Sequence, residues 1–114
     1  TRPYLIAELQ RFRRSLEEFI GQEVSDQAIR ASIELYNEKR HLLARLHELR
    51  ARLSAPELFA VTSAGFTMPV EEYNSLVAEL VECLAEVETT QTKGSGLVLV
   101  GAVLEDLGLL SRVE

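Results

Sequence analysis

The sequence predicts a mostly α-helical protein, in which long amphipathic helices form a bundle or connector that is followed by the first strand and helix of a truncated α/β domain. Apolar residues recur at steps of three and four through most of residues 3–88, the spacing that gathers side chains on one face of a helix. Pro and Gly stand where these patterns start and stop. Residues 97–100 break the pattern with a continuous run of Leu and Val, which is typical of a strand buried on both faces.

The first helix is expected over residues 3–20. Its apolar residues share one face because they are spaced by three or four, and they are Leu5, Leu9, Phe12, Leu16 and Phe19. Pro3 suits the first helical turn. Gly21 is placed to end the helix in a left-handed conformation.

A second, longer helix is expected from about Asp26 to Leu53, with Ser25 or Asp26 as its N-terminal cap. Its apolar spacing is close to a heptad seam, made of Ile29, Ile33, Tyr36, Leu43, Leu46, Leu49 and Leu53. About 28 residues at 1.5 Å each would span roughly 40 Å, which is longer than a small domain is wide. Part of this seam is therefore expected to pack on something absent from the chain.

Ser54, Ala55 and Pro56 are expected to stop the second helix. A short helix from Pro56 to about Ser63 would follow, and then a third long helix from about Pro69 to Glu88. The buried stripe of that third helix is predicted as Tyr73, Leu76, Val77, Leu80, Leu84 and Val87. Its acidic outer face is predicted as Glu71, Glu72, Glu79, Glu82 and Glu86.

The end of the chain predicts the start of a different domain. Residues 89–96 are polar and contain glycine, residues 97–100 are the predicted strand, Gly101 ends it, and a helix is expected from about Leu104. Strand, glycine turn and helix open a βαβ unit, yet a doubly buried strand needs neighbours that this sequence does not supply. We expect a helical connector over residues 1–93 and the start of a truncated Rossmann-like α/β domain over residues 94–114, in a chain cut from a larger protein.

Composition and charge limit the classes of function. The longest apolar stretch, residues 96–104, is far shorter than a membrane span, no signal peptide is visible, and the single cysteine fits a reducing compartment. We therefore expect a cytoplasmic protein with no membrane contact. Residues 1–52 hold ten of the twelve Lys and Arg together with eight acids. Because these charges alternate at helical spacing, they indicate a solvated face, and no nucleic-acid binding is expected.

The titratable residues do not combine into a recognisable catalytic or metal site. His41 and His47 do not share a helical face and lack further ligands at suitable spacing. No His follows the acids of residues 71–86 at the offset that di-metal helical bundles use. These acids therefore favour a solvated face rather than a metal site.

The remaining candidates for chemistry have equally plain explanations. Cys83 has no Lys or Arg within one helical turn to favour the thiolate, so it is interpreted as a packing residue. The Gly-bearing segment 93–96 precedes the predicted strand, whereas a phosphate loop follows its strand. Ser63 and Ser95 have no paired base. We assign no catalytic, cofactor-binding or metal-ligating residue.

The order of several short phrases resembles the family of 2-hydroxyacyl-CoA dehydratases and benzoyl-CoA reductases, named for the D component of 2-hydroxyglutaryl-CoA dehydratase. The phrases are Leu9 and Phe12, residues 16–21 (LEEFIG), Val24 and Ser25, Ala28 and Ile29, residues 36–40 (YNEKR), residues 46–50 (LHELR), residues 64–69 with Glu71 and Glu72, and residues 98–101. They span nearly the whole chain.

The resemblance implies a parent enzyme rather than an activity of these residues alone. Family members are two-domain α/β subunits that pair with a related second subunit, hold an iron–sulfur cluster through cysteines, and receive electrons from an ATP-hydrolysing activator. They act on an acyl-CoA substrate, by radical dehydration of a 2-hydroxyacyl-CoA or by reduction of an aromatic ring, in anaerobic metabolism. A four-iron four-sulfur cluster is thus expected in the parent and none in this fragment, because one cysteine cannot hold a cluster.

Three further points stay open at the level of sequence. Asn37, Glu38 and Arg40 could line a cleft or bind CoA phosphates, but side-chain bonds that fix the long helix are the favoured interpretation. The alternative to an enzyme fragment is a helical protein–protein interaction or dimerisation module without catalytic activity. A homo-oligomer formed through the exposed helix seams also stays open.

Overall fold

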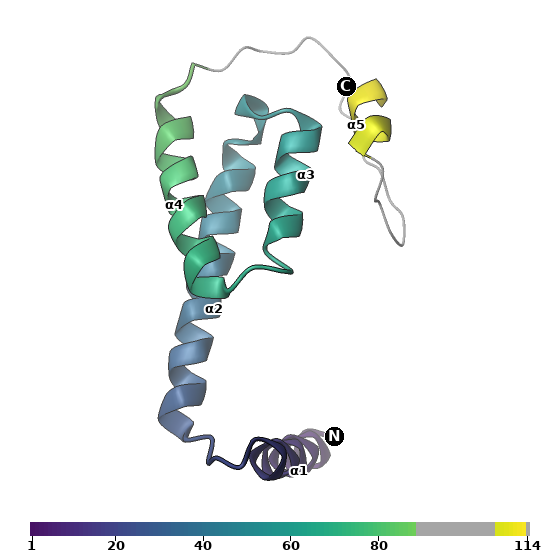
Figure 1. Ribbon diagram of the computed structural model, residues 1–114, viewed down its shortest axis with the longest axis vertical. Coiled ribbons are helices and arrows are strands. Elements are labelled where there is room, and N and C mark those ends of the chain that lie inside the picture. Colours follow the sequence, from purple (N-terminus) through teal and green to yellow (C-terminus); the bar gives the residue numbers. More distant parts are fainter. Residues whose placement is uncertain (89–106, 114) are drawn as a thin grey trace. The chain divides into compact units, whose positions relative to one another are not determined.

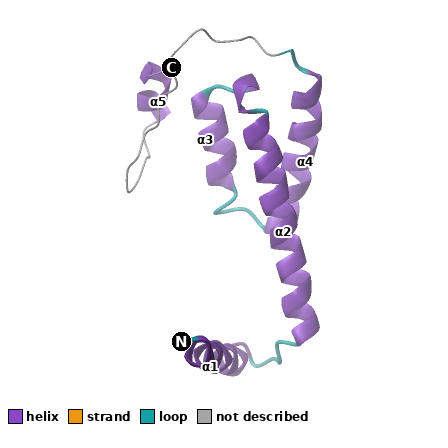
Figure 2. Ribbon diagram, turned by 180° about the vertical axis from the view of Figure 1, so that it is seen from behind, coloured by secondary structure: helices purple, strands orange, loops and turns teal. Residues whose placement is uncertain are grey.

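The computed structural model describes residues 1–88 and 107–113, and in these residues the chain is helical (Figure 1). The elements are α1 (Arg2–Ile20), α2 (Asp26–Glu48), a short 3-10 helix η1 (Arg50–Arg52), α3 (Ala55–Ala64), α4 (Val70–Glu86) and α5 (Leu107–Val113). The mostly α-helical prediction is therefore confirmed. Residues 1–88 and 107–113 contain no strand, and the strand predicted at 97–100 lies outside them (Figure 2).

The chain divides into two compact units, residues 1–34 and residues 35–114. The division falls within α2. No described helix is both long enough and apolar enough to cross a membrane.

Unit 1 consists of α1, a short turn and the beginning of α2. Gly21 takes the left-handed conformation (φ 68°, ψ 21°) that its position predicts, and its backbone N–H donates to the Glu17 carbonyl at 2.9 Å. Ser25 is the cap of α2, because its hydroxyl accepts from the Ala28 backbone N–H at 3.1 Å. No residue of unit 1 is buried.

Unit 2 holds the hydrophobic core. The second half of α2 packs with α3 and α4, which lie alongside it in both views (Figures 1 and 2). The buried apolar residues come from α2 and α4: Leu42, Leu46, Tyr73, Val77, Val81 and Leu84. Partly buried side chains from η1, α3 and the adjoining turns complete the cluster, among them Leu53, Leu58, Val61 and Met68.

The long helix ends five residues earlier than its heptad spacing predicts. The backbone N–H of Leu49 is shared between the carbonyls of Arg45 (3.2 Å) and Leu46 (3.1 Å), and the chain then tightens into η1. Arg52 turns towards α4, where its guanidinium donates to the carbonyl of Leu84 at 2.7 Å. Arg52 thus adds a second donor to the Leu84 carbonyl, which also accepts from the Val87 backbone N–H at 3.2 Å in the last turn of α4.

Ser54 starts α3 rather than merely stopping the preceding helix. Its side chain accepts from the Glu57 backbone N–H, and the Glu57 carboxylate accepts from the Ser54 backbone N–H at 2.8 Å. This reciprocal pair is a capping box. It fixes the point where the chain reverses after η1 and so sets the position of α3 on the core.

Candidate functional site

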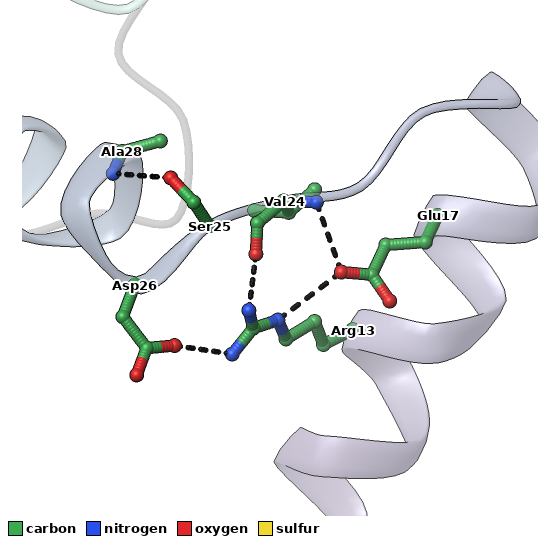
Figure 3. Close-up of polar contacts among 6 residues, drawn as sticks. All are labelled: Arg13, Glu17, Val24, Ser25, Asp26 and Ala28. Atoms are coloured by element: carbon green, nitrogen blue, oxygen red, sulfur yellow. Dashed lines mark hydrogen bonds and ion pairs between the residues drawn. The ribbon is translucent and has the colours of Figure 1, made fainter.

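Arg13 joins α1 to the turn that leads into α2 (Figure 3). Its Nε donates to Glu17 Oε1 at 3.2 Å, its Nη1 donates to Asp26 Oδ1 at 2.6 Å, and its Nη2 donates to the Val24 carbonyl. Glu17 Oε1 also accepts from the Val24 backbone N–H at 2.9 Å. We call these four residues the Arg13 latch, since one planar guanidinium holds three acceptors at once.

The carboxylates of the Arg13 latch stabilise the charged form of Arg13. The hydrogen bond to Asp26, together with the one to Glu17, raises the pKa of Arg13 above its ordinary value despite some loss of solvation. Arg13 is therefore a fixed cation at every pH at which the protein is handled. Its donors already serve acceptors of the same unit, which makes it a structural group rather than a free anion receptor.

Two shallow depressions lie beside the latch on unit 1. One is lined by Gln10, Arg13, Arg14, Glu17 and Glu23, and the other by Arg14, Glu17, Glu18, Gly21, Gln22 and Glu23. Both mix cations and carboxylates, so neither presents a field of one sign to a ligand. Neither depression has the apolar, enclosed lining that small-molecule sites usually have.

Lys39 lies at the centre of a second polar cluster, in unit 2. Its ammonium group donates to the carbonyl of Gly65 and lies 4.8 Å from the centre of the Tyr73 ring and 5.8 Å from that of Tyr36. The Tyr73 hydroxyl donates to the Val61 carbonyl at 3.1 Å. Burial raises the pKa of Tyr73, so the phenol stays neutral and keeps its proton for this bond. The cluster joins α2, α3 and α4 through cation–π and hydrogen-bond contacts.

Asn74 is a buried polar residue, 4% exposed, on the core face of α4. Its Nδ2 donates to the Leu35 carbonyl at 3.1 Å and to Glu38 Oε2 at 3.3 Å. Its Oδ1 is buried without a hydrogen-bond partner. Glu38 thus joins α2 to α4, whereas Arg40 and Asn37 bond to each other along α2 at 2.6 Å. These side-chain bonds fix the long helix α2, which is the role that the sequence favoured for Asn37, Glu38 and Arg40.

The other chemistry-bearing residues stand apart from one another. Cys83 is exposed on α4, and His41 and His47 are exposed on α2. Within residues 1–88 and 107–113, no three His, Cys, Asp or Glu side chains gather as a metal site would require. Segment 93–96, Ser95 and Gly101 lie outside the described residues.

The acidic outer face of α4 is exposed as predicted, and carries Glu71, Glu72, Glu79, Glu82 and Glu86. The buried face differs from the prediction. Leu76 and Val87 are 50% and 48% exposed, while Asn74 and Val81 are buried in their place. The core-facing stripe runs 73, 77, 81 and 84, because α4 turns towards α2 on the side of these residues.

Comparison with known proteins gives a consistent answer. The family model described as "2-hydroxyglutaryl-CoA dehydratase, D-component" matches residues 1–114. A benzoyl-CoA reductase subunit of Thauera aromatica is 31% identical over 117 residues, covering 97% of this chain and 30% of that protein. The beta subunit of lactoyl-CoA dehydratase from Anaerotignum propionicum is 30% identical over 114 residues, covering 94% of this chain and 30% of that protein. No solved structure gives a significant match.

The matched relatives are therefore more than three times as long as the matched region. The phrases that carry the sequence resemblance lie on the helices α1, α2, η1 and α4, at the end of α3, and in the turns that follow α1 and α3, with the last one, residues 98–101, outside the described residues. The family match runs from the first to the last residue of the chain. The chain belongs to the family of the 2-hydroxyglutaryl-CoA dehydratase D component.

Proposed function

We propose that the chain is the helical part of one subunit of an iron–sulfur acyl-CoA dehydratase or aromatic acyl-CoA reductase, and that it is inactive by itself. The observation that carries the proposal is the family match over residues 1–114, together with relatives named for an acyl-CoA dehydratase and an acyl-CoA reductase. In the parent enzyme the reaction would be radical dehydration of a 2-hydroxyacyl-CoA or ATP-driven reduction of an aromatic ring. A CoA thioester is the substrate class common to both.

The residues of this chain do not fit an iron–sulfur cluster. Clusters are held by several cysteine thiolates, and the sequence contains one cysteine. Cys83 is exposed on a helix whose charged residues are all acids, including Glu82 and Glu86. The four-iron four-sulfur cluster of the proposal would therefore be held by other parts of the parent, and we derive no chemical step from these residues.

The proposed role of the chain is to hold other parts of the subunit in place. Unit 2 is suited to this because its helices are fixed to one another by a shared core, the Lys39 cluster and the Asn74 bonds. Such a packed scaffold positions catalytic groups that lie on neighbouring segments. The partners proposed for the parent are a related second subunit and an ATP-hydrolysing activator, in the cytoplasm of a cell that lives without oxygen.

Iron analysis of the full-length subunit tests the proposal. Purified without oxygen, the subunit is expected to contain about four iron atoms and to absorb in the visible range of thiolate–iron bonds. The 114-residue chain, prepared in the same way, serves as the matched control and is expected to contain no iron. A full-length subunit without iron and without this absorbance would remove the cluster and the chemistry assigned to the parent.

A helical interaction module is the second candidate, and one observation favours it. The apolar stripe of α1 is exposed along its whole length. A module of this kind would lack iron. Its full reading frame would encode neither further predicted strands nor further cysteines. The reading frame and the iron measurement therefore separate the two candidates.

A further inference from the structure

Unit 1 has an apolar face without a core of its own. The stripe of α1 follows the heptad steps 4, 3, 4 and 3, and the exposed fractions of its residues are 59% for Leu5, 57% for Leu9, 66% for Phe12, 38% for Leu16 and 88% for Phe19. Tyr4, Ile6 and Ile20 extend the exposed apolar surface to eight large side chains. Monomeric proteins rarely expose a continuous apolar patch of this kind without using it for contact.

The contacts inside unit 1 are polar and lie at the surface. The Arg13 latch fixes the turn between α1 and α2, with Arg13 and Asp26 side chains 33% and 77% exposed. Exposed ion pairs contribute little to stability, and most of the stability of a helix in a protein comes from packing of its amphipathic face. The latch therefore orients α1, but burial of the apolar stripe is what would hold it as a helix.

We propose that the α1 stripe (Leu5, Leu9, Phe12, Leu16 and Phe19) is a docking seam for another segment of the same subunit, one that lies outside residues 1–114. The inference rests on the proposed function, in which the chain is part of a longer subunit. The length of the relatives supports it, since the matched region accounts for 30% of each of them. The seam takes an apolar helix face, because its 4-3-4-3 spacing is that of helix-to-helix packing.

A second copy of the chain is the weaker occupant for two reasons. Eight apolar residues on α1 are far fewer than the roughly 20–30 residues per partner in a stable interface. The stripe covers fewer than the three to four heptads over which a coiled coil is recognised. A tethered segment avoids most of the entropy cost that two free molecules pay on association, so a seam of this size suffices within one polypeptide.

Cysteine labelling tests the seam directly. Leu9→Cys and the matched control Arg11→Cys, on the polar side of α1, are each introduced with Cys83→Ser to remove the native thiol. In the 114-residue chain both positions are expected to react with a maleimide at similar rates. In the full-length subunit Leu9→Cys is expected to react at least tenfold more slowly, while Arg11→Cys keeps its rate. Hydrogen exchange of the α1 amides in the unsubstituted proteins gives the same comparison without any mutation.

Four outcomes would overturn the inference. The first is equal labelling of Leu9→Cys in the 114-residue chain and in the full-length subunit, and the second is protection of Leu9→Cys already present in the 114-residue monomer. The third is a dimer of the 114-residue chain, seen in sedimentation, that Phe12→Glu dissociates. The fourth is protection of Leu9→Cys that appears only when the second subunit is added. Iron content and activity of the assembled enzyme are measured separately. An active enzyme with an unprotected seam contradicts only this inference, whereas a protected seam in a subunit that lacks iron contradicts only the proposed function.

Discussion

Gly21 and Gly65 are required for opposite physical reasons. Gly21 has φ 68° and open space around the position of a Cβ atom, so its constraint is the backbone. Gly65 has φ −65°, which every residue tolerates, but a Cβ there would lie 2.9 Å from Tyr73 Cζ and 3.2 Å from the end of Lys39. The lack of a side chain is needed for conformation at one site and for space at the other.

Substitution by two different residues separates these reasons. Gly21→Ala is expected to cost about 1–2 kcal/mol of unfolding free energy, and Gly21→Asn less, because asparagine tolerates the left-handed region. Gly65→Ala is expected to cost about 1–3 kcal/mol through overpacking, and Gly65→Asn at least as much. Urea denaturation measures all four. Asparagine restoring stability at position 65 would contradict the steric explanation.

Asn74 allows a test of what a buried polar group contributes. In Asn74→Asp a carboxylate would face the Leu35 carbonyl and the Glu38 carboxylate. We expect a loss of about 1–3 kcal/mol or more at pH 7. Repulsion and burial raise the folded-state pKa of the new acid, so its native form binds the proton more tightly and stability recovers as the pH falls. Asn74→Leu removes the unpaired oxygen together with the amide donor. It is expected to lower the unfolding free energy less than Asn74→Asp does when both are measured by urea denaturation at pH 7.

At the scale of elements, the capping box of α3 predicts a pH dependence. The bonds from the Ser54 backbone N–H and then from its hydroxyl lower the pKa of Glu57 from its ordinary value of 4.5. A depressed folded-state pKa gives stability that is present above pH 4.5 and is lost as the pH falls through the lower folded value. Glu57→Gln should therefore flatten the fall of the thermal midpoint on the acid side of pH 4.5.

Ser54→Ala is the companion variant for this cap. It is expected to cost about 1 kcal/mol at pH 7 and to remove the hydroxyl donor to Glu57 while the backbone N–H donor stays, so the pKa of Glu57 is expected to rise only part of the way back to its ordinary value. Nuclear magnetic resonance titration of the Glu57 carboxyl measures that change. A titration curve unaltered by Ser54→Ala would show that the Ser54 hydroxyl has no influence on this acid.

The helices were predictable from spacing, but the sides they bury were predictable only in part. Periodicity locates α1, α2 and α4 because apolar residues at steps of three and four define a face. Spacing does not say which side of a broad apolar face meets a neighbour. Leu76 and Val81 are both apolar, and only contact with α2 decides that Val81 is buried and Leu76 is half exposed.

The polar clusters were harder still to predict. Arg13 and Glu17 stand four apart, which indicates a pair on one helix. Nothing local places Asp26 and the Val24 carbonyl on the same guanidinium, because that depends on the path of the turn. Lys39 and Asn74 likewise meet partners 26 to 39 residues away. The capping box does carry a local signature, a serine followed three residues later by a glutamate, and the prediction of Ser54 as a helix stop missed it.

At the scale of the whole molecule, the core lies only in unit 2. Two changes, one in each unit, are therefore expected to lower the stability by very different amounts. Removal of residues 1–21 deletes all of α1 but no buried residue. Leu46→Ala deletes three carbon atoms from a side chain that is 0% exposed. The truncation is expected to leave the thermal midpoint of unfolding nearly unchanged, whereas Leu46→Ala is expected to cost about 2–5 kcal/mol.

Circular dichroism measures both changes, with the loss of helical signal confirming that α1 was removed. A midpoint that falls as far in the truncation as in Leu46→Ala would mean that α1 contributes to the core of unit 2. At this scale the order of short phrases was enough to indicate the family, which the family match confirms. The predicted domain boundary at residues 93 and 94 lies outside the described residues and stays a prediction.

The contact of Lys39 with Gly65 makes this lysine a chemical reporter. Lys39 is the only lysine in the described part of the chain, and its amine is held against a carbonyl and two aromatic rings. An acylating reagent needs a free, neutral amine, so it can modify Lys39 only when the amine leaves the Gly65 carbonyl. The rate of acetylation at this one residue, read by mass spectrometry, is therefore expected to report how often this contact breaks and to increase in Gly65→Ala, where a Cβ would crowd the end of Lys39.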